Sequence, residues 1–169
     1  MTMDMVAVRA KAGEATVYRR WASKEELILD AVARMKGSAV DLEDLPDTGN
    51  LRDDLIALFR PQSAEEETRR LNAMAGLVSL LSHRAVFAEA AHGALIEPWS
   101  EAHRLLMSRA ATRDEIPSTA DIDTICEVLP TMAAYRTIVQ RRPFDRDFLV
   151  STIDILILPA LHRGPTEGP

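Results

Sequence analysis

The side chains best suited to binding a charged polymer lie together near the start of the chain, which has 169 residues. Thr16, Tyr18, Arg19, Arg20 and Lys24 bring hydroxyl and cationic groups into one short stretch. Hydroxyls and cations bond the phosphate oxygens of nucleic acids, and Arg also bonds the edges of bases. These residue types therefore indicate a surface that contacts a nucleic-acid duplex.

The distribution of charge places this surface at one end of the protein. The chain has 20 Lys and Arg against 26 Asp and Glu, a net charge of -6 that argues against nucleic-acid binding over the whole surface. From Met1 to Lys24, however, five basic residues stand against two acidic ones, so this end carries +3 and the remainder -9. We expect a basic N-terminal region on an acidic body.

Patterns typical of catalytic or metal sites do not emerge from the sequence. The histidines His83, His92, His103 and His162 do not combine with carboxylates or with Cys126 at the spacing of metal ligands. The sequence also has no Gly-rich phosphate loop and no nucleophile-elbow motif. We expect no enzymatic activity, cofactor or metal, and a small helical enzyme is only the third hypothesis.

The single cysteine and the absence of long apolar runs indicate the compartment. Cys126 cannot close an intrachain disulfide, and the first twenty residues carry charges where a secretory signal needs an apolar run. The apolar stretch Leu71–His83 is shorter than the roughly 20 residues of a membrane helix. We expect a cytoplasmic protein that does not cross a membrane, with Cys126 an inert core thiol rather than a redox sensor.

Local signals arrange the candidate surface as helix, turn and helix. A short helical segment precedes Gly13, and a second one, from about Glu14 to Arg20, follows it. Ser23 followed by Glu26 has the form of a capping box, which predicts a third helix over Lys24–Lys36. This is the layout of a helix-turn-helix.

The whole chain is predicted to be all-α, because helix-forming residues dominate and apolar residues recur every three or four positions. The predicted organisation is an incomplete helix-turn-helix over residues 1–36, a linker or loop over 37–50, a helical effector-binding and dimerisation domain over 51–163, and a tail over 164–169. Helices of the body are predicted at Leu51–Phe59, Ser63–His83, Ala85–Arg109, Asp121–Arg141 and Asp145–His162. Pro98 should kink or divide its helix, and Pro130 should bend its helix.

The last predicted helix is apolar on almost every side, so we expect part of it to meet a second subunit. A fully buried central helix is the alternative, and a buried strand over Ile153–Leu158 is disfavoured because no second strand is apparent. The candidate dimer interface comprises Ile122, Leu129, Tyr135, Ile153, Leu156 and Ile157.

The N-terminal stretch resembles the DNA-binding signature of the tetracycline-repressor (TetR) family of bacterial transcription regulators. The matching positions are Thr16, Val17, Tyr18, Trp21, Ser23, Lys24, Glu25 and Leu27. A weaker similarity to the family's C-terminal ligand-binding and dimerisation domain covers Arg109–Ala111, Glu115–Ile116, Ala120–Asp121 and Tyr135 to Pro143. Between Asn50 and Arg104 only the helical character agrees.

The resemblance implies separate roles for the side chains of a recognition helix in the major groove. Thr16, Tyr18, Arg19 and Lys24 would bond phosphates and set the register of the protein on DNA. Glu14, Ala15 and Arg20 would touch base edges and set the sequence preference. The alternatives are that Tyr18 and Trp21 form a packed aromatic pair, that Glu14 is a helix N-terminal charge favoured by the dipole, and that Arg19 and Arg20 form a solvated face.

Two departures from the family pattern are visible. Lys11 stands where the family usually has its turn glycine, and Gly13 replaces the usual Ser or Thr cap of the recognition helix. A full helix precedes this segment in the family, whereas only Met1, Thr2 and Met3 precede Asp4 here. The head is therefore expected to be N-terminally truncated and loosened, with a turn built differently.

Together these observations predict a homodimeric transcriptional regulator, a repressor that binds double-stranded DNA and responds to a small-molecule effector. A dimeric helical ligand-binding module that has lost DNA binding is the alternative. His92 and His103 flank Trp99 and are candidates for lining a pocket, although a surface or satisfied core role is favoured for each. The candidate pocket wall consists of Met74, Leu77, Leu81, Trp99, Leu106 and Met107.

Overall fold

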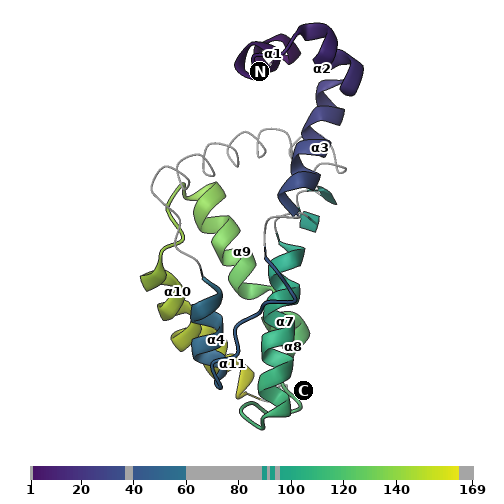
Figure 1. The fold of residues 1–169 in the computed structure, drawn as a ribbon. Helices are drawn as coiled ribbons and strands as arrows, with labels where there is room; N and C mark the ends of the chain where they lie inside the picture. The colour runs from purple at the N-terminus through teal and green to yellow at the C-terminus, as the bar shows by residue number, and fades with distance from the viewer. Residues whose placement is uncertain (1, 37–39, 60–88, 91, 94–95, 164–169) are drawn as a thin grey trace, which may run out of the picture.

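The computed structural model describes residues 2–36, 40–59, 89–90, 92–93 and 96–163. Every regular element within these ranges is helical, which confirms the all-α prediction. A small head formed by the first helices stands at one end of the molecule, and its last helix, α3 (Lys24–Lys36), runs towards the larger helical body (Figure 1). The predicted helix over residues 63–83 lies outside the described residues.

The head contains α1 (Met3–Arg9), α2 (Glu14–Arg20) and α3 (Lys24–Lys36), as the sequence predicted. Met3, Ala7 and Val17 are buried together and form its small core. Ala12, Trp21 and Leu27 pack around them, partly buried. Two apolar side chains of α1, Met5 and Val8, are 60% and 76% exposed. The loosening of the head stays a prediction.

The body contains α4 (Leu51–Leu58), α7 (Glu97–Thr112), α8 (Ile122–Ile125), α9 (Val128–Ala134), α10 (Arg146–Thr152) and α11 (Leu158–Leu161). Two π-helical turns, η1 (Tyr135–Val139) and η2 (Ile153–Ile157), continue α9 and α10. The predicted helical regions 51–59, 121–141 and 145–162 are thus helical apart from short breaks. Ile153 belongs to η2, which excludes the strand alternative.

Both prolines lie in the first turn of a helix, not in a helix interior, where Pro130 was predicted to cause a bend. Pro98 occupies the first turn of α7, and Pro130 occupies the first turn of α9, which follows a break after α8. A backbone amide in the first turn has no partner within its helix, so proline sacrifices no hydrogen bond there. Both helices consequently begin next to their proline.

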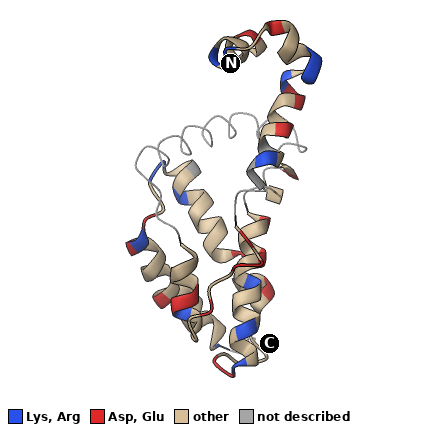
Figure 2. Ribbon diagram, viewed as in Figure 1, with Lys and Arg blue, Asp and Glu red and all other residues tan. Residues whose placement is uncertain are grey.

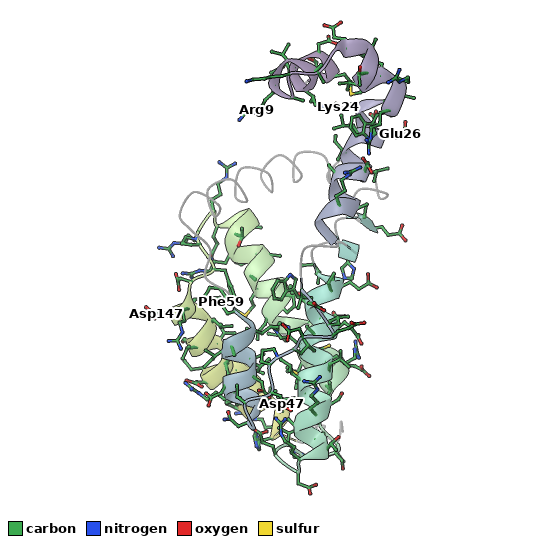
Figure 3. The ribbon with its side chains drawn as sticks, viewed as in Figure 1. Arg9, Lys24, Glu26, Asp47, Phe59 and Asp147 are labelled. Atoms are coloured by element: carbon green, nitrogen blue, oxygen red, sulfur yellow. The ribbon has the colours of Figure 1, made fainter. Side chains whose placement is uncertain are left out.

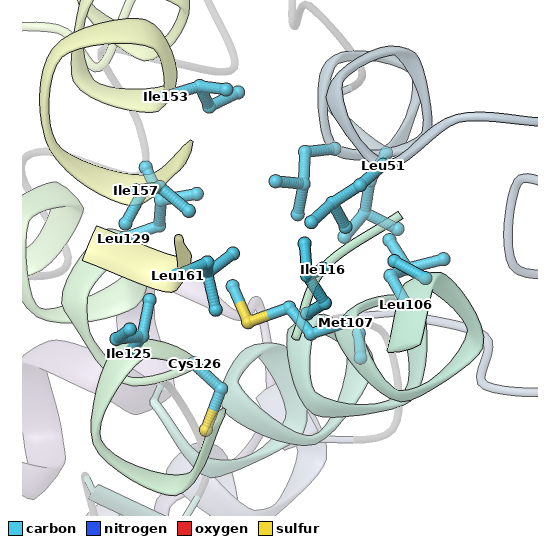
Figure 4. Packing of buried hydrophobic residues seen from close by; sticks show 14 of the residues in the cluster. Leu51, Leu106, Met107, Ile116, Ile125, Cys126, Leu129, Ile153, Ile157 and Leu161 are labelled. Carbon is cyan, nitrogen blue, oxygen red and sulfur yellow. The ribbon is translucent and has the colours of Figure 1, made fainter. Parts of the chain in front are cut away.

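The hydrophobic core of the body joins helices from both ends of its sequence. Leu51, Leu106, Met107, Ile153 and Ile157 are each no more than 1% exposed and converge from α4, α7 and η2 (Figure 4). Cys126 lies in this same cluster with its thiol donating to the Asp123 carbonyl at 3.2 Å, and burial raises its pKa. None of the described helices combines the length and apolar character that crossing a bilayer would demand.

Candidate nucleic-acid interface

The turn between α1 and α2 depends on a left-handed backbone at Lys11, where φ is 51°. The amide of Ala12 closes this turn by donating to the Ala7 carbonyl at 3.0 Å. Gly13 then caps α2 with an extended backbone and no side-chain hydrogen bond. Lys11 therefore supplies the conformation that glycine adopts most readily, and the turn is formed without glycine at that position.

The recognition-helix candidate α2 is fixed to the head by a single buried side chain, Val17, which is 4% exposed. Val17 packs against Met3 and Ala7 of α1. Every residue of α2 that the sequence predicted to contact DNA is exposed. These exposed residues are Glu14, Ala15, Thr16, Tyr18, Arg19 and Arg20.

The Tyr18 hydroxyl has a partner that the sequence pattern did not reveal. It donates to Oδ1 of Asp4 on α1 over 3.2 Å. Desolvation and the negative charge of Asp4 raise the pKa of Tyr18, so its hydroxyl remains a protonated donor at neutral pH. A hydroxyl predicted to bond a phosphate thus bonds a carboxylate in this structure.

Trp21 links the end of α2 to α3. Its indole nitrogen donates to Oδ2 of Asp30 at 3.0 Å, and Nε of Arg34 donates to the same oxygen at 3.2 Å. The guanidinium of Arg20 lies over the Trp21 ring, 5.0 Å from its centroid. This cation–π contact restricts the directions from which Arg20 approaches a base.

The N-terminus of α3 is capped close to the predicted pattern. The Ser23 hydroxyl accepts from the Glu26 amide at 3.1 Å, whereas the Glu26 carboxylate accepts from Ala22, one residue earlier than in a standard capping box. Lys24, half-buried, opens the helix beside this cap. Figure 3 shows Arg9 and Lys24 in the head, far from the body.

Basic side chains are distributed over all three helices of the head. They lie at the end of α1, at the end of α2 and at the start of α3 (Figure 2). Acidic groups are interspersed with them, since Asp4, Glu14, Glu25 and Glu26 occupy first helical turns. The basic side chains of the head are therefore divided among its three helices and interspersed with carboxylates.

Comparisons with known proteins agree with this geometry. Residues 1–31 match the family model described as bacterial regulatory proteins, tetR family. Residues 45–156 match the family model described as tetracyclin repressor-like, C-terminal domain. The chain belongs to the TetR family. It is a TetR-family helix-turn-helix transcriptional regulator.

Similar transcriptional regulators match over most of the chain. An uncharacterized HTH-type transcriptional regulator of Mycobacterium tuberculosis is 35% identical over 165 residues, which cover 97% of this chain and 79% of the relative. A DNA-binding transcriptional repressor, TetR, of Mycobacteroides abscessus is 29% identical over 96% of this chain and 84% of the relative. An uncharacterized HTH-type transcriptional regulator of Bacillus subtilis is 22% identical over 139 residues, which cover 82% of this chain and 69% of the relative.

The predicted effector pocket of this TetR-family regulator is described only in part. Met74, Leu77 and Leu81 lie outside the described residues. Leu106 and Met107 are completely buried in the core of the body, and Trp99 packs against that core, partly buried. Their role in a pocket stays a prediction.

The residues predicted for the dimer interface fall into two groups. Leu129, Ile153 and Ile157 are at most 2% exposed, because helices of the same chain already cover them. Ile122 is half-buried. Tyr135 and Leu156 are 54% and 47% exposed and remain available to a partner.

Sequence reasoning also missed exposed apolar residues of this TetR-family body. Val139 of η1 is 64% exposed and Ile155 of η2 is 68% exposed. Both were indistinguishable from core residues in the sequence, because a π-helical turn shifts the face on which each side chain lies. The carboxylate of Asp154, next to Ile155, accepts two hydrogen bonds from Arg52 of α4. Nε of Arg52 donates to Oδ1 at 2.7 Å, and Nη2 donates to Oδ2 at 2.9 Å.

Proposed function

We propose that this TetR-family regulator is a homodimeric repressor that binds double-stranded DNA through its head and releases it when a small molecule binds the body. The observation that carries the proposal is the exposed face of α2, held at the tip of the molecule by Val17. A short helix with this exposure fits the major groove of DNA. Repression is supported by the repressor of M. abscessus, which is 29% identical.

Two copies of the head are needed because one seven-residue recognition helix reads too few base pairs for specificity. A two-fold dimer would present two heads to half-sites about 34–36 Å apart. The exposed apolar residues Tyr135, Val139, Ile155 and Leu156 support a dimer surface on η1 and η2. Exposed apolar side chains are typical of protein interfaces when they form a patch.

Regulation requires that the effector bind more tightly to one spacing of the heads than to another, since equal affinity for both would change nothing. The segment between the head and body supports such coupling. Thr48 of this segment donates through its amide and its hydroxyl to Oδ1 of Asp54 on α4, at 2.6 and 2.7 Å. A displacement of α4 would therefore be transmitted to the segment that follows α3.

Binding to a random duplex over a series of salt concentrations tests the DNA-binding proposal. We expect affinity to fall steeply with salt, because each phosphate contact releases counterions. Lys24→Ala should weaken binding to all sequences and reduce the log–log salt slope by about 0.9. Arg146→Ala, which removes an exposed cation of the body, is the matched control and should leave binding unchanged.

The contribution of Arg20 to sequence preference is tested on a selected operator. Arg20→Ala should reduce the affinity ratio between operator and random duplex, since base contacts specify and phosphate contacts position. Absence of duplex binding even at low salt would contradict the proposal. That result would favour a dimeric ligand-binding module without DNA-binding activity.

A further inference from the structure

Two polar atoms are buried without partners on one face of α7. Ser100 and His103 are each 6% exposed and lie one helical turn apart. The Ser100 hydroxyl and His103 Nδ1 have no hydrogen-bond partner among the residues that the structure describes. Buried polar atoms are nearly always paired, so two neighbouring exceptions call for an explanation.

Comparable groups elsewhere in the protein show that the local backbone could satisfy such atoms. The hydroxyls of Thr112 and Thr152 donate to carbonyls one turn earlier, at 3.0 and 2.8 Å. His162 Nδ1 lies 2.7 Å from the Leu158 carbonyl, also one turn earlier. Ser100 and His103 make no such bond to the preceding turn of α7. Their polar atoms therefore lack the backbone partner that the other three groups have.

The charge state of His103 defines what these atoms can bind. Burial lowers the pKa of His103 to about 4, partly opposed by a hydrogen bond with the Cys126 backbone, so the ring is neutral at pH 7. The Cys126 carbonyl lacks a helical donor four residues later, because Pro130 has no amide hydrogen. A carbonyl accepts, and Nδ1 has no partner, so we assign the proton of the neutral ring to Nε2, which leaves Nδ1 as an acceptor.

Several residues next to the pair on α7 are apolar. Leu106 and Met107 of the same helix are fully buried in the core, and Trp99 precedes Ser100 and packs against that core. Arg104, whose charge is paired with Glu101 and Asp123, lies on another side of the helix. A ligand reaching Ser100 and His103 would thus meet one acceptor, one hydroxyl and apolar side chains.

We propose that Ser100 and His103 form the hydrogen-bonding end of the effector site, and that this site takes an uncharged, largely apolar alcohol or phenol. The inference rests on the proposed effector-binding function. A ligand hydroxyl donates to His103 Nδ1 while accepting from the Ser100 hydroxyl, which satisfies both atoms at once. A carboxylate would face the lone pair of Nδ1 and lose its hydration without a compensating cation.

Ligand-observed saturation-transfer NMR on the full chain tests this assignment with phenol, toluene and benzoate as probes. We expect phenol to bind at least about tenfold more tightly than either of the others, the ratio that one buried hydrogen bond supplies. Ser100→Ala and His103→Leu should each weaken phenol binding about tenfold and leave toluene binding unchanged. Ser151→Ala, at an exposed helical serine of α10, is the matched control.

Two further measurements keep the test independent of folding defects. Ser100→Ala should melt at or above the temperature of the wild type, since it removes an unpaired hydroxyl. The nitrogen-15 spectrum of His103 should show an unprotonated Nδ1 at pH 7. Equal binding of phenol and toluene, no binding of phenol, or a protonated Nδ1 would each overturn the assignment.

The outcomes separate this inference from the proposed function. Duplex binding together with failure of phenol to bind would overturn only the ligand assignment. Phenol binding that depends on Ser100 and His103, in a chain that binds no duplex, would uphold the assignment and overturn the repressor proposal. Phenol binding that also lowers duplex affinity would support both.

Discussion

Arg113, in the loop after α7, holds the fully buried carboxylate of Asp54 on α4, with 3.1 Å between Nη2 and Oδ2. The same nitrogen lies 3.1 Å from Oε2 of Glu115, whose other oxygen accepts from the Leu51 amide at 2.6 Å. Thr48 completes the coordination of Asp54. The segment after the head, the start of α4 and the α7–α8 loop therefore meet in one charged network.

Removing Arg113 should destabilise the body, because the Asp54 carboxylate would remain buried without its cation. We expect Arg113→Ala to lower the free energy of unfolding by about 2–3 kcal/mol, less than for a fully buried pair since Arg113 itself is 28% exposed. Urea denaturation measures this change. Arg109→Ala, an exposed cation of α7, should cost under about 0.5 kcal/mol, and equal losses in the two variants would contradict the argument.

Lys11 should be replaceable by glycine with a gain in stability. A left-handed backbone costs a residue with a side chain about 1–2 kcal/mol, and glycine avoids this cost. Part of the gain is lost because glycine has a greater conformational entropy in the unfolded state. We expect Lys11→Gly to raise the free energy of unfolding of the head by about 0.5–1 kcal/mol. Lys11→Ala removes the same charge but keeps Cβ, so a similar gain in that variant would show that backbone strain is not the cause.

Asp4 should weaken DNA binding, because its carboxylate bonds the Tyr18 hydroxyl and repels phosphates. We expect Asp4→Asn to increase duplex affinity about twofold to fivefold at low salt, with a smaller effect at high salt. The substitution should also lower the pKa of Tyr18, which alkaline absorbance titration measures. Glu25→Gln, at an exposed carboxylate of α3, is the charge-matched control; an equal gain there would indicate a nonspecific charge effect.

The sequence predicts the helices of the head well because their signals are local. Ser23 and Glu26 place the start of α3, and Gly13 lies immediately before α2. The exposure of α2 also follows from local periodicity, since Val17 is the apolar residue that faces α1. Patterns within one helical turn thus carry both the elements and the candidate contact surface.

Partners distant in sequence could not be predicted in this way. Asp4 and Tyr18 are fourteen residues apart, and Arg52 and Asp154 are 102 apart, so only the folded chain brings them together. The sequence of an all-apolar helix also does not show which of its side chains are buried. Ile155 and Ile157 have the same side chain, yet one is 68% and the other 1% exposed, because packing against the body selects one face of η2.

His103 should limit the stability of the body in mild acid. Its pKa is about 4 in the folded chain and about 6.5 when unfolded, so only the unfolded state gains a proton as the pH falls between these values. The stability present above pH 6.5 is therefore lost towards pH 4, by about 3 kcal/mol in total. His103→Leu should abolish this part of the loss, measured by urea denaturation at pH 7 and 4.5. An unchanged pH dependence, or the same effect from His162→Leu at an exposed site, would contradict this assignment.

Leu156 should be required for the proposed dimer. It is 47% exposed beside Ile155 on η2, and a charge at an apolar interface core loses its hydration without a partner. We expect wild-type protein to have the mass of a dimer by light scattering and Leu156→Asp to shift it towards the monomer with little loss of helix by circular dichroism. Leu42→Asp, at an exposed leucine in the segment before α4, should remain dimeric. The two heads must be joined to read two half-sites, so the monomeric variant should also lose operator affinity while keeping weak binding to random duplex. If Leu156→Asp remained fully dimeric, the interface would lie elsewhere.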